Sequence, residues 1–295
     1  MTPTSVPSAP WQGGRGQTAP AYRTASRPPT GAEVGRVIET GLFAVVYQPI
    51  VDITPLNAGS RPRGYEALSR FSIGSPAQWF ATASRTGLRI ELELAAIRLA
   101  IAGFPASDSN AFLALNASIE TLCSPLLFES LEGIAPERIV LELPEDTFIA
   151  DYDGIRFHID RLLGRGFRLA MDDLARGRVD LWHLVRLRPS IIKIDLSMVR
   201  DIDIDPSKQS LVNGLRLLGD VLRAEVVAKG IERQGELDFL QQLGVHLGQG
   251  NFLGRPGPIG APPVDPLGID TGSGGAGPGL SPAWGAVGPR LPPGP

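Results

Sequence analysis

The segment EVVAKGIE, residues 225–232, sets the pattern that decides the fold. Two Val and one Ala, typical of the inside of a buried strand, run directly into Lys229, Gly230 and then Glu232. The chain contains three Lys among 295 residues. An ammonium group at the end of an apolar strand therefore needs a physical reason. The residues at the ends of the other predicted strands bear on that reason.

Eight segments have this short, apolar character. The predicted strands are 42–51, 64–71, 111–118, 138–145, 167–173, 190–197, 225–232 and 248–254. Amphipathic segments with apolar residues three and four apart lie between them, at 91–104, 155–167, 209–224 and 235–244. Apolar strands joined by helices indicate parallel strands buried on both faces, and eight units favour an α/β barrel of the triosephosphate-isomerase type, a (β/α)8 barrel. The alternative is an open doubly wound sheet, although no glycine-rich phosphate loop follows the first strand.

Composition limits the classes of function. A net charge of -3, from 28 basic and 31 acidic residues, lacks the basic footprint of a general nucleic-acid binder, so no DNA partner is expected. No apolar run approaches the roughly 20 residues of a membrane span, and no signal peptide is visible, so we expect a cytoplasmic protein without a membrane partner. The single Cys123 is expected to be a small buried apolar residue.

The two ends differ from the middle. Residues 1–31 are rich in Pro, Ser, Thr and Gly, and residues 257–295 are rich in Gly and Pro. Such segments contain too few large apolar side chains to offset the entropy lost on ordering. We expect two disordered tails around one folded domain at 32–256.

Polar residues gather where the predicted strands end. In strand order they are Glu66, Asn116, Glu142, Glu145, Asp172, Asp173, Lys193, Asp195, Lys229 and Glu232, and Gln249 stands at the beginning of the eighth strand. The carboxyl ends of parallel barrel strands meet at one mouth, where such barrels carry out their chemistry. A ring of carboxylates repels itself unless a divalent cation, a basic group or protonation compensates. The alternative is that each residue simply faces solvent.

The order of these motifs carries a resemblance. The series YQPIVDI, GYEALSRF, LNAS, LELPE, MDD, IIKIDLSMV, VVAKGIE and GQGNFLGRP resembles the EAL domain family, bacterial phosphodiesterases that linearise cyclic di-GMP. Residues 66–68 match the triplet that names the family. The resemblance implies a modified barrel whose first strand is antiparallel to the rest. It also implies cyclic di-GMP as ligand, Mg²⁺ or Mn²⁺ as cofactor, and a homodimer.

The resemblance assigns roles by position. Glu66, Asn116, Glu142 and Asp172 match the ligands of a first cation, with Asp172 shared, and Asp173 matches a ligand of a second. Lys193 matches the lysine beside the attacking water, and Glu232 the second glutamate of the seventh-strand motif. Gln249, Leu68 and Arg70 match substrate-binding positions. Glu145 matches the glutamate that anchors the loop after the fifth strand.

Two departures from the family pattern bear on activity. The seventh strand of the family typically reads A-E-G-V-E, and Lys229 stands at its first glutamate, so we expect the second cation to be weakened severely. Lys229 either reaches the barrel rim and pairs with Glu232 or Asp173, or its ammonium replaces the charge of the second cation. The second departure is the segment 174–180, LARGRVD, in place of a phenylalanine followed by a Gly-Thr-Gly turn. This puts the usual regulation and dimer contacts in question.

Three functions follow. The first is a binding or signalling module for cyclic di-GMP with impaired catalysis, and the second is an active phosphodiesterase that yields linear pGpG. The third is a scaffold that binds no nucleotide. Any input signal is expected from a protein partner, because no sensor domain fits in the tails.

Overall fold

The computed structural model describes residues 27–54, 62–105, 110–145, 151–175 and 181–259. Most of the two expected tails lies outside these residues, so their disorder stays a prediction. The nearest residues on both sides contact the domain. Thr30 and Glu33 form a capping box at the start of the first helix, and the backbone of Gly257 pairs with Tyr47.

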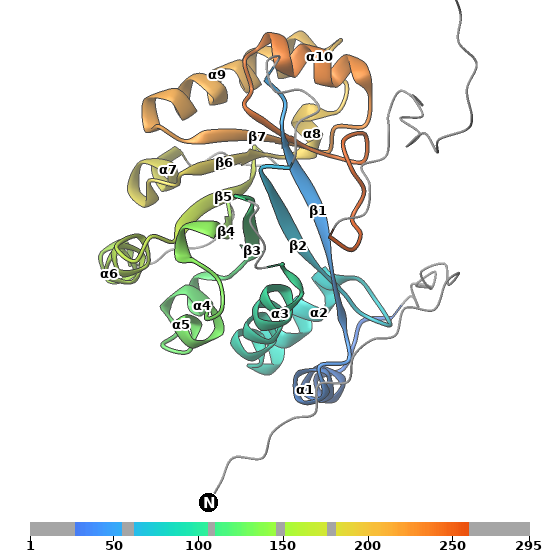
Figure 1. Ribbon diagram of the computed structural model, residues 1–295, viewed down its shortest axis with the longest axis vertical. Coiled ribbons are helices and arrows are strands. Elements are labelled where there is room, and N and C mark those ends of the chain that lie inside the picture. Colours follow the sequence, from blue (N-terminus) through green and yellow to red (C-terminus); the bar gives the residue numbers. More distant parts are fainter. Residues whose placement is uncertain (1–26, 55–61, 106–109, 146–150, 176–180, 260–295) are drawn as a thin grey trace, which may run out of the picture. The chain divides into compact units, whose positions relative to one another are not determined.

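Eight strands close into a barrel in sequence order (Figure 1). They are β1 (Ala44–Asp52), β2 (Gly64–Arg70), β3 (Phe112–Asn116), β4 (Ile139–Pro144), β5 (Arg168–Leu174), β6 (Ile191–Ile194), β7 (Glu225–Lys229) and β8 (Leu247–Gln249). Strand β1 is antiparallel to both β2 and β8, and every other neighbouring pair is parallel. The closed barrel and its reversed first strand are therefore confirmed, and the open doubly wound sheet is wrong.

Helices cover the outside of the sheet (Figure 1). They are α1 (Gly31–Thr40), α2 (Pro76–Thr86), α3 (Arg89–Gly103), α4 (Ile119–Cys123), α5 (Leu127–Ser130), the short 3-10 helix η1 (Pro136–Arg138), α6 (Tyr152–Leu163), α7 (Leu181–Leu187), α8 (Leu196–Val199), α9 (Pro206–Leu222) and α10 (Gln234–Gln242). Helices α3, α6, α9 and α10 correspond to the four predicted amphipathic segments. No helix in the described part of the chain has both the length and the apolar character needed to cross a membrane.

Helices α1 and α2 build a small second core that the sequence pattern did not predict. Val34 of α1 and Trp79 of α2 are buried with Phe71, and the rings of Phe71 and Trp79 stack 4.5 Å apart. The Cys123 expectation also needs correction. Its free thiol is half-buried, because α4 ends at this residue near the surface.

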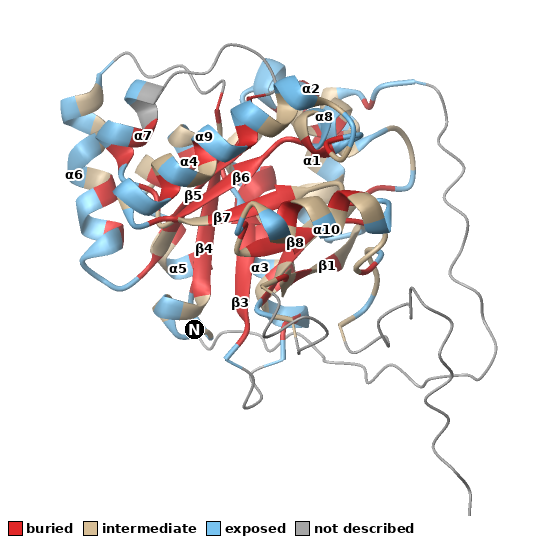
Figure 2. Cartoon of the chain, turned by 90° about the horizontal axis from the view of Figure 1, so that it is seen from above, coloured by how far each residue is buried: buried red, intermediate tan, exposed pale blue. Residues whose placement is uncertain are grey.

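Strands β3 to β8 form the most deeply buried layer of the domain, whereas most residues of β1 and β2 are half-buried (Figure 2). One cluster of buried apolar residues draws on seven of the eight strands: Ile50, Phe112, Ala114, Val140, Ala170, Ile191, Val227 and Leu247. These residues fill the barrel interior. They form an apolar floor below the carboxyl ends of the parallel strands.

Candidate active site

Strand alternation brings seven polar side chains to the barrel mouth. They are Glu66, Asn116, Glu142, Asp172, Lys193, Lys229 and Gln249. Successive side chains on a strand point to opposite faces, so residues two apart share a face. For six of these residues, the residue two positions earlier belongs to the interior cluster, and the seventh, Glu66, follows Gly64 at the same spacing. The polar residues therefore lie directly above the apolar floor.

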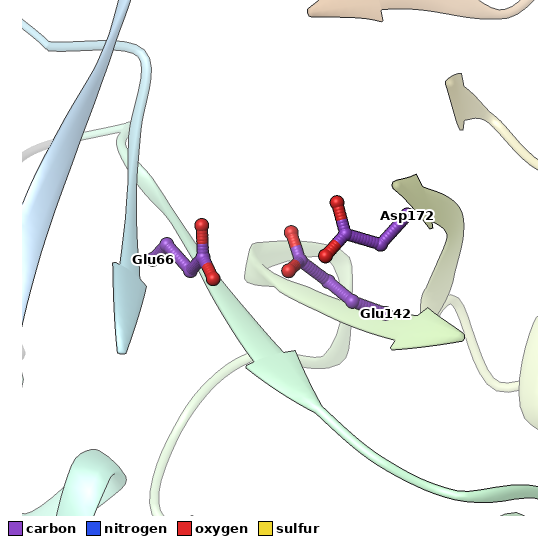
Figure 3. Close-up of side chains that lie close together, drawn as sticks. All are labelled: Glu66, Glu142 and Asp172. Atoms are coloured by element: carbon purple, nitrogen blue, oxygen red, sulfur yellow. The ribbon is translucent and has the colours of Figure 1, made fainter. Parts of the chain in front are cut away.

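Three carboxylates converge inside the mouth (Figure 3). Glu66 of β2, Glu142 of β4 and Asp172 of β5 each offer one oxygen atom, and these atoms lie within 4.8 Å of one another. Their exposed fractions are 5%, 1% and 6%. The strand predicted at 64–71 is observed as β2, so Glu66 lies near its start and not at its end, and the rest of β2 pairs with β1 as far as Ala44.

Lys193 lies between these carboxylates and is fully buried. Its Nζ atom donates to Glu66 Oε2 at 2.8 Å and to the two oxygens of Glu142 at 2.6 Å and 2.8 Å. Asp172 Oδ1 lies 3.8 Å away. Burial alone would lower the pKa of Lys193, but the negative charges of Asp172, Glu142 and Glu66 outweigh it and raise the pKa. The surrounding carboxylates therefore favour the charged form of Lys193 at the centre of the site.

Lys229 neutralises the other side of the cluster. Its Nζ atom donates to Asp172 Oδ1 and Oδ2 at 2.7 Å and 2.9 Å, and to Asp173 Oδ1 at 2.6 Å. Burial and the nearby charge of Lys193 oppose protonation, yet Asp172, Glu66 and Asp173 raise the pKa of Lys229. The ammonium at the end of this apolar strand is thus held by two carboxylates of β5.

Two lysines face four carboxylates, so the site keeps an excess of negative charge. Burial disfavours the charge on Glu66, but Lys193 and Lys229 outweigh this and lower its pKa to about 2. Glu142 behaves in the opposite way. Its burial, together with the charges of Glu66 and Asp172, raises its pKa to about 8 against the attraction of Lys193. A proton or a further cation relieves the repulsion that remains.

Two amide side chains complete the contacts of Glu66. Asn116 Nδ2 donates to Glu66 Oε1 at 3.3 Å, and Gln249 Nε2 donates to Glu66 Oε2 at 2.7 Å. Gln249 Nε2 also donates to Gln48 Oε1 at 3.2 Å. The sequence prediction missed Gln48, which pairs in register with Glu66. Gln48 could have been identified from the sequence, because it is a polar residue inside the apolar strand segment AVVYQPIV, residues 44–51.

The remaining predicted residues lie around this centre. Leu68 and Arg70 follow Glu66 at two-residue spacing along β2, and Glu66 acts electrostatically on the Arg70 guanidinium. Glu145 is buried and its Oε2 accepts a hydrogen bond from the Ala175 backbone at 2.9 Å. It therefore holds the first residues after β5. Residues 176–180 of the altered loop lie outside the described residues.

Glu232 does not join the carboxylate cluster. Its side chain is 52% exposed, and a carboxylate oxygen lies 3.9 Å from Arg200 Nη2. The reason is local, because β7 ends at Lys229 and Gly230 has a φ of 74°, which ends the strand alternation. Lys229 contacts Asp172 and Asp173, and among the described residues it does not pair with Glu232, whose carboxylate lies near Arg200 instead.

Known proteins resemble the chain in both sequence and structure. MucR of Pseudomonas aeruginosa, named a bifunctional diguanylate cyclase and cyclic di-GMP phosphodiesterase, is 29% identical over 245 residues, which is 77% of this chain and 35% of MucR. The cyclic di-GMP phosphodiesterase PA2567 of the same organism is 30% identical over 228 residues, covering 72% of this chain and 38% of PA2567. The chain thus spans about a third of the length of these curated relatives.

Solved structures share the barrel. The PaMucR phosphodiesterase in complex with c-di-GMP superposes with a TM-score of 0.68 at 26% identity, over 77% of this chain and 97% of that one. Klebsiella pneumoniae BlrP1 with calcium and cyclic di-GMP gives a TM-score of 0.65 at 32% identity, over 72% of this chain and 55% of BlrP1. The model of the EAL domain matches residues 32–256. The chain belongs to the EAL domain family.

Proposed function

We propose that this EAL domain binds cyclic di-GMP at the barrel mouth together with one divalent cation, and that its phosphodiesterase activity is impaired. One observation carries the proposal. The ammonium of Lys229 lies within 2.6–2.9 Å of Asp172 and Asp173, the two carboxylates that the family pattern implies for the second cation. The module then recognises the nucleotide and hydrolyses it slowly or not at all.

The donor set fits a first divalent cation. Oxygen atoms of Glu66, Glu142 and Asp172 lie within 4.8 Å of one another, and carboxylate oxygen is the ligand type that Mg²⁺ and Mn²⁺ prefer. Asn116, hydrogen-bonded to Glu66, would add its amide oxygen. Bound there, the cation would polarise a phosphate oxygen and lower the pKa of a bound water. Lys193 shares the same oxygens, so a cation binds in competition with it.

The donor set does not fit a second divalent cation. Both oxygens of Asp172 and Oδ1 of Asp173 already accept hydrogen bonds from Lys229. A cation placed among them would be repelled by an ammonium whose pKa is raised. Two-cation catalysis stabilises both the attacking and the leaving oxygen of the displaced phosphate, and Lys229 can provide only electrostatic attraction at this position.

The charges at the mouth fit a phosphodiester dinucleotide as the ligand. Each phosphodiester of cyclic di-GMP carries a negative charge, and Arg70 and Lys229 present positive charge beside Glu66. Leu68 lies between Glu66 and Arg70 on the same strand face and offers an apolar contact to a base. Relatives that carry this nucleotide in solved complexes support the assignment.

An active phosphodiesterase is the second candidate. Its support is the retained first-cation set and the buried Lys193, which lies 2.6 Å from Glu142 and 2.8 Å from Glu66. In this reading Lys193 would position the attacking water, and Lys229 would move away from Asp172 and Asp173. A scaffold without nucleotide is disfavoured, because three buried carboxyl groups around the buried Lys193 are costly to keep without a ligand. A homodimer, a signalling partner and a cytoplasmic location stay predictions.

Calorimetry and product analysis test the proposal. Purified protein is titrated with cyclic di-GMP in EDTA, in Mg²⁺ and in Mn²⁺, and linear dinucleotide is quantified by chromatography from the same samples. We expect binding with little or no product. Rapid product formation would establish the enzyme, and absence of binding under all three conditions would establish the scaffold.

A further inference from the structure

Gln249 carries a buried acceptor that has no donor among the described residues. The residue is 3% exposed, and its Oε1 atom makes no hydrogen bond. A buried polar atom left unpaired is destabilising, because it loses its hydrogen bonds to water and gains none in return. Native structures keep such atoms rarely, and mainly where a water, an ion or a ligand completes them.

The orientation of this amide is fixed from two sides. Its Nε2 atom donates to Glu66 Oε2 at 2.7 Å, and the same oxygen accepts a hydrogen bond from Lys193 Nζ at 2.8 Å. Turning the amide over would place Oε1 against that carboxylate. The second contact is Gln48 Oε1, which accepts from the same Nε2 at 3.2 Å. The unpaired atom is therefore the oxygen.

Gln48 is itself oriented by the backbone. Its Nε2 atom donates to the carbonyl oxygen of Gly254 at 3.2 Å, so its Oε1 is the atom left to face Gln249. Gly254 follows β8 and approaches β1 so closely that a Cβ atom there would overlap Pro49. A backbone carbonyl thus sets the direction of Gln48, which sets the direction of Gln249.

The unpaired oxygen lies one water away from the carboxylates. The oxygen and nitrogen of one amide are about 2.2 Å apart, so Gln249 Oε1 lies within about 5 Å of Glu66 Oε2. Two hydrogen bonds through a single water span about that distance. A water bound to a cation is a strong donor, because the cation draws electron density from its O–H bonds.

We propose that Gln48 is a positioning residue of the site: it holds the Gln249 amide so that Oε1 accepts a hydrogen bond from a water bound to the divalent cation at Glu66, Glu142 and Asp172. The inference rests on the cation of the proposed function. It is independent of the nucleotide and of hydrolysis. Partners of this kind typically change metal affinity by 10- to 100-fold.

Mn²⁺ binding without nucleotide tests this role. Free Mn²⁺ is followed by electron paramagnetic resonance in wild type, Gln48→Met, Gln249→Met and the double variant. Gln209→Met is the matched control, since Gln209 also donates to a backbone carbonyl, that of Ile202, at 2.9 Å and outside the site. Gln48→Ala replaces Gln48→Met if the latter does not fold, and circular dichroism reports folding.

We expect each single variant at Gln48 or Gln249 to weaken Mn²⁺ binding by about tenfold, and the control to leave it unchanged. The double variant should bind no more weakly than Gln249→Met, because Gln48 acts through Gln249. Unchanged affinity in Gln48→Met, or losses that multiply in the double variant, would overturn the inference while leaving the proposed function intact. A wild type that binds no Mn²⁺ would overturn the inference and the cation of the proposed function together.

Discussion

The Nζ atom of Lys229 lies 2.7 Å and 2.9 Å from the two carboxylate oxygens of Asp172. This contact joins the end of β7 to the end of β5 across the mouth of the barrel. It uses both oxygens of a residue that the family pattern assigns to two cations at once. The charge that such a site would draw from solution is thus supplied in part by the chain itself.

Removing this ammonium should destabilise the protein in the absence of divalent cations. Lys229→Met removes the ammonium that contacts both Asp172 and Asp173, and breaking a buried pair costs about 3–5 kcal/mol. With 17% of the Lys229 side chain exposed, solvent screening reduces the expected loss to about 2 kcal/mol. Urea unfolding in EDTA measures the free energy of unfolding.

Millimolar Mg²⁺ should then stabilise Lys229→Met more than wild type, because it replaces the lost charge. Lys208→Met is the control, since Lys208 donates to the Arg200 carbonyl away from the mouth. Equal stability of Lys229→Met and wild type in EDTA would show that this ion pair contributes nothing.

The first cation should be visible directly. A Mn²⁺-soaked crystal should give one anomalous peak within ligand distance of Glu66, Glu142 and Asp172, and none between Asp172 and Asp173. A second peak beside Lys229 would contradict the account of that residue. Absence of any peak at millimolar metal would remove the cation from the proposed function.

Ala175 should be a site of backbone strain. Its φ is 71°, and its N–H is held by Glu145 Oε2 at 2.9 Å. The left-handed conformation costs a non-glycine residue about 1–2 kcal/mol, so Ala175→Gly should raise the free energy of unfolding by roughly 0.5 kcal/mol after the extra entropy of the unfolded glycine is subtracted.

The matched control is Ala81→Gly within α2, where the same change should lower the free energy of unfolding by about 1 kcal/mol. Urea unfolding of both variants gives the comparison. If the two changes destabilise the protein equally, residue 175 carries no strain.

Much of this site could be predicted from the sequence, and the predictions that failed did so for physical reasons. Apolar strands with polar ends placed Glu66, Lys193 and Lys229 at one mouth, because parallel strands align their carboxyl ends. The sequence named Asp173 and Glu232 as alternative partners of Lys229, and the structure shows Asp173 together with Asp172, which was not named. A four-carbon side chain can reach several carboxylates, so the choice among them depends on the distances between strands. Glu232 was grouped with the site because the predicted strand was extended past Gly230 to residue 232, whereas β7 ends at Lys229.

Two further features escaped the sequence pattern. The reversed direction of β1 came only from the family resemblance, since its apolar pattern suits either direction of pairing. Gln48 was overlooked because its neighbours are apolar, and its role depends on pairing with β2 and on the return of the chain at Gly254. Both features depend on contacts between segments far apart in sequence.

Tyr47 should make stability depend on alkaline pH. Its hydroxyl donates to the Ala100 carbonyl at 2.7 Å, and burial raises the pKa of Tyr47 to about 12. The folded state favours the neutral phenol, so this contribution is complete below the unfolded pKa near 10 and is lost as pH rises towards 12.

Tyr47→Phe should lower the free energy of unfolding by about 1 kcal/mol at pH 7 to 9. It should also reduce the fall in stability between pH 10 and 12. Urea unfolding across this pH range measures both effects. Identical pH profiles for the variant and wild type would contradict the assignment to Tyr47.

The rate of linear product formation from cyclic di-GMP in wild type and Lys229→Glu tests the central claim most directly. The substitution exchanges the ammonium beside Asp172 and Asp173 for a carboxylate, which restores an oxygen ligand and removes the repulsion of a second cation. The rates are compared at saturating Mg²⁺ or Mn²⁺, and nucleotide binding is measured separately. Lys229→Glu should form product at least about tenfold faster than wild type, because the restored carboxylate adds one stabilising interaction in the transition state. Turnover by wild type at an ordinary rate of about 1 per second or more, with no gain in Lys229→Glu, would show that Lys229 does not stand in for the second cation.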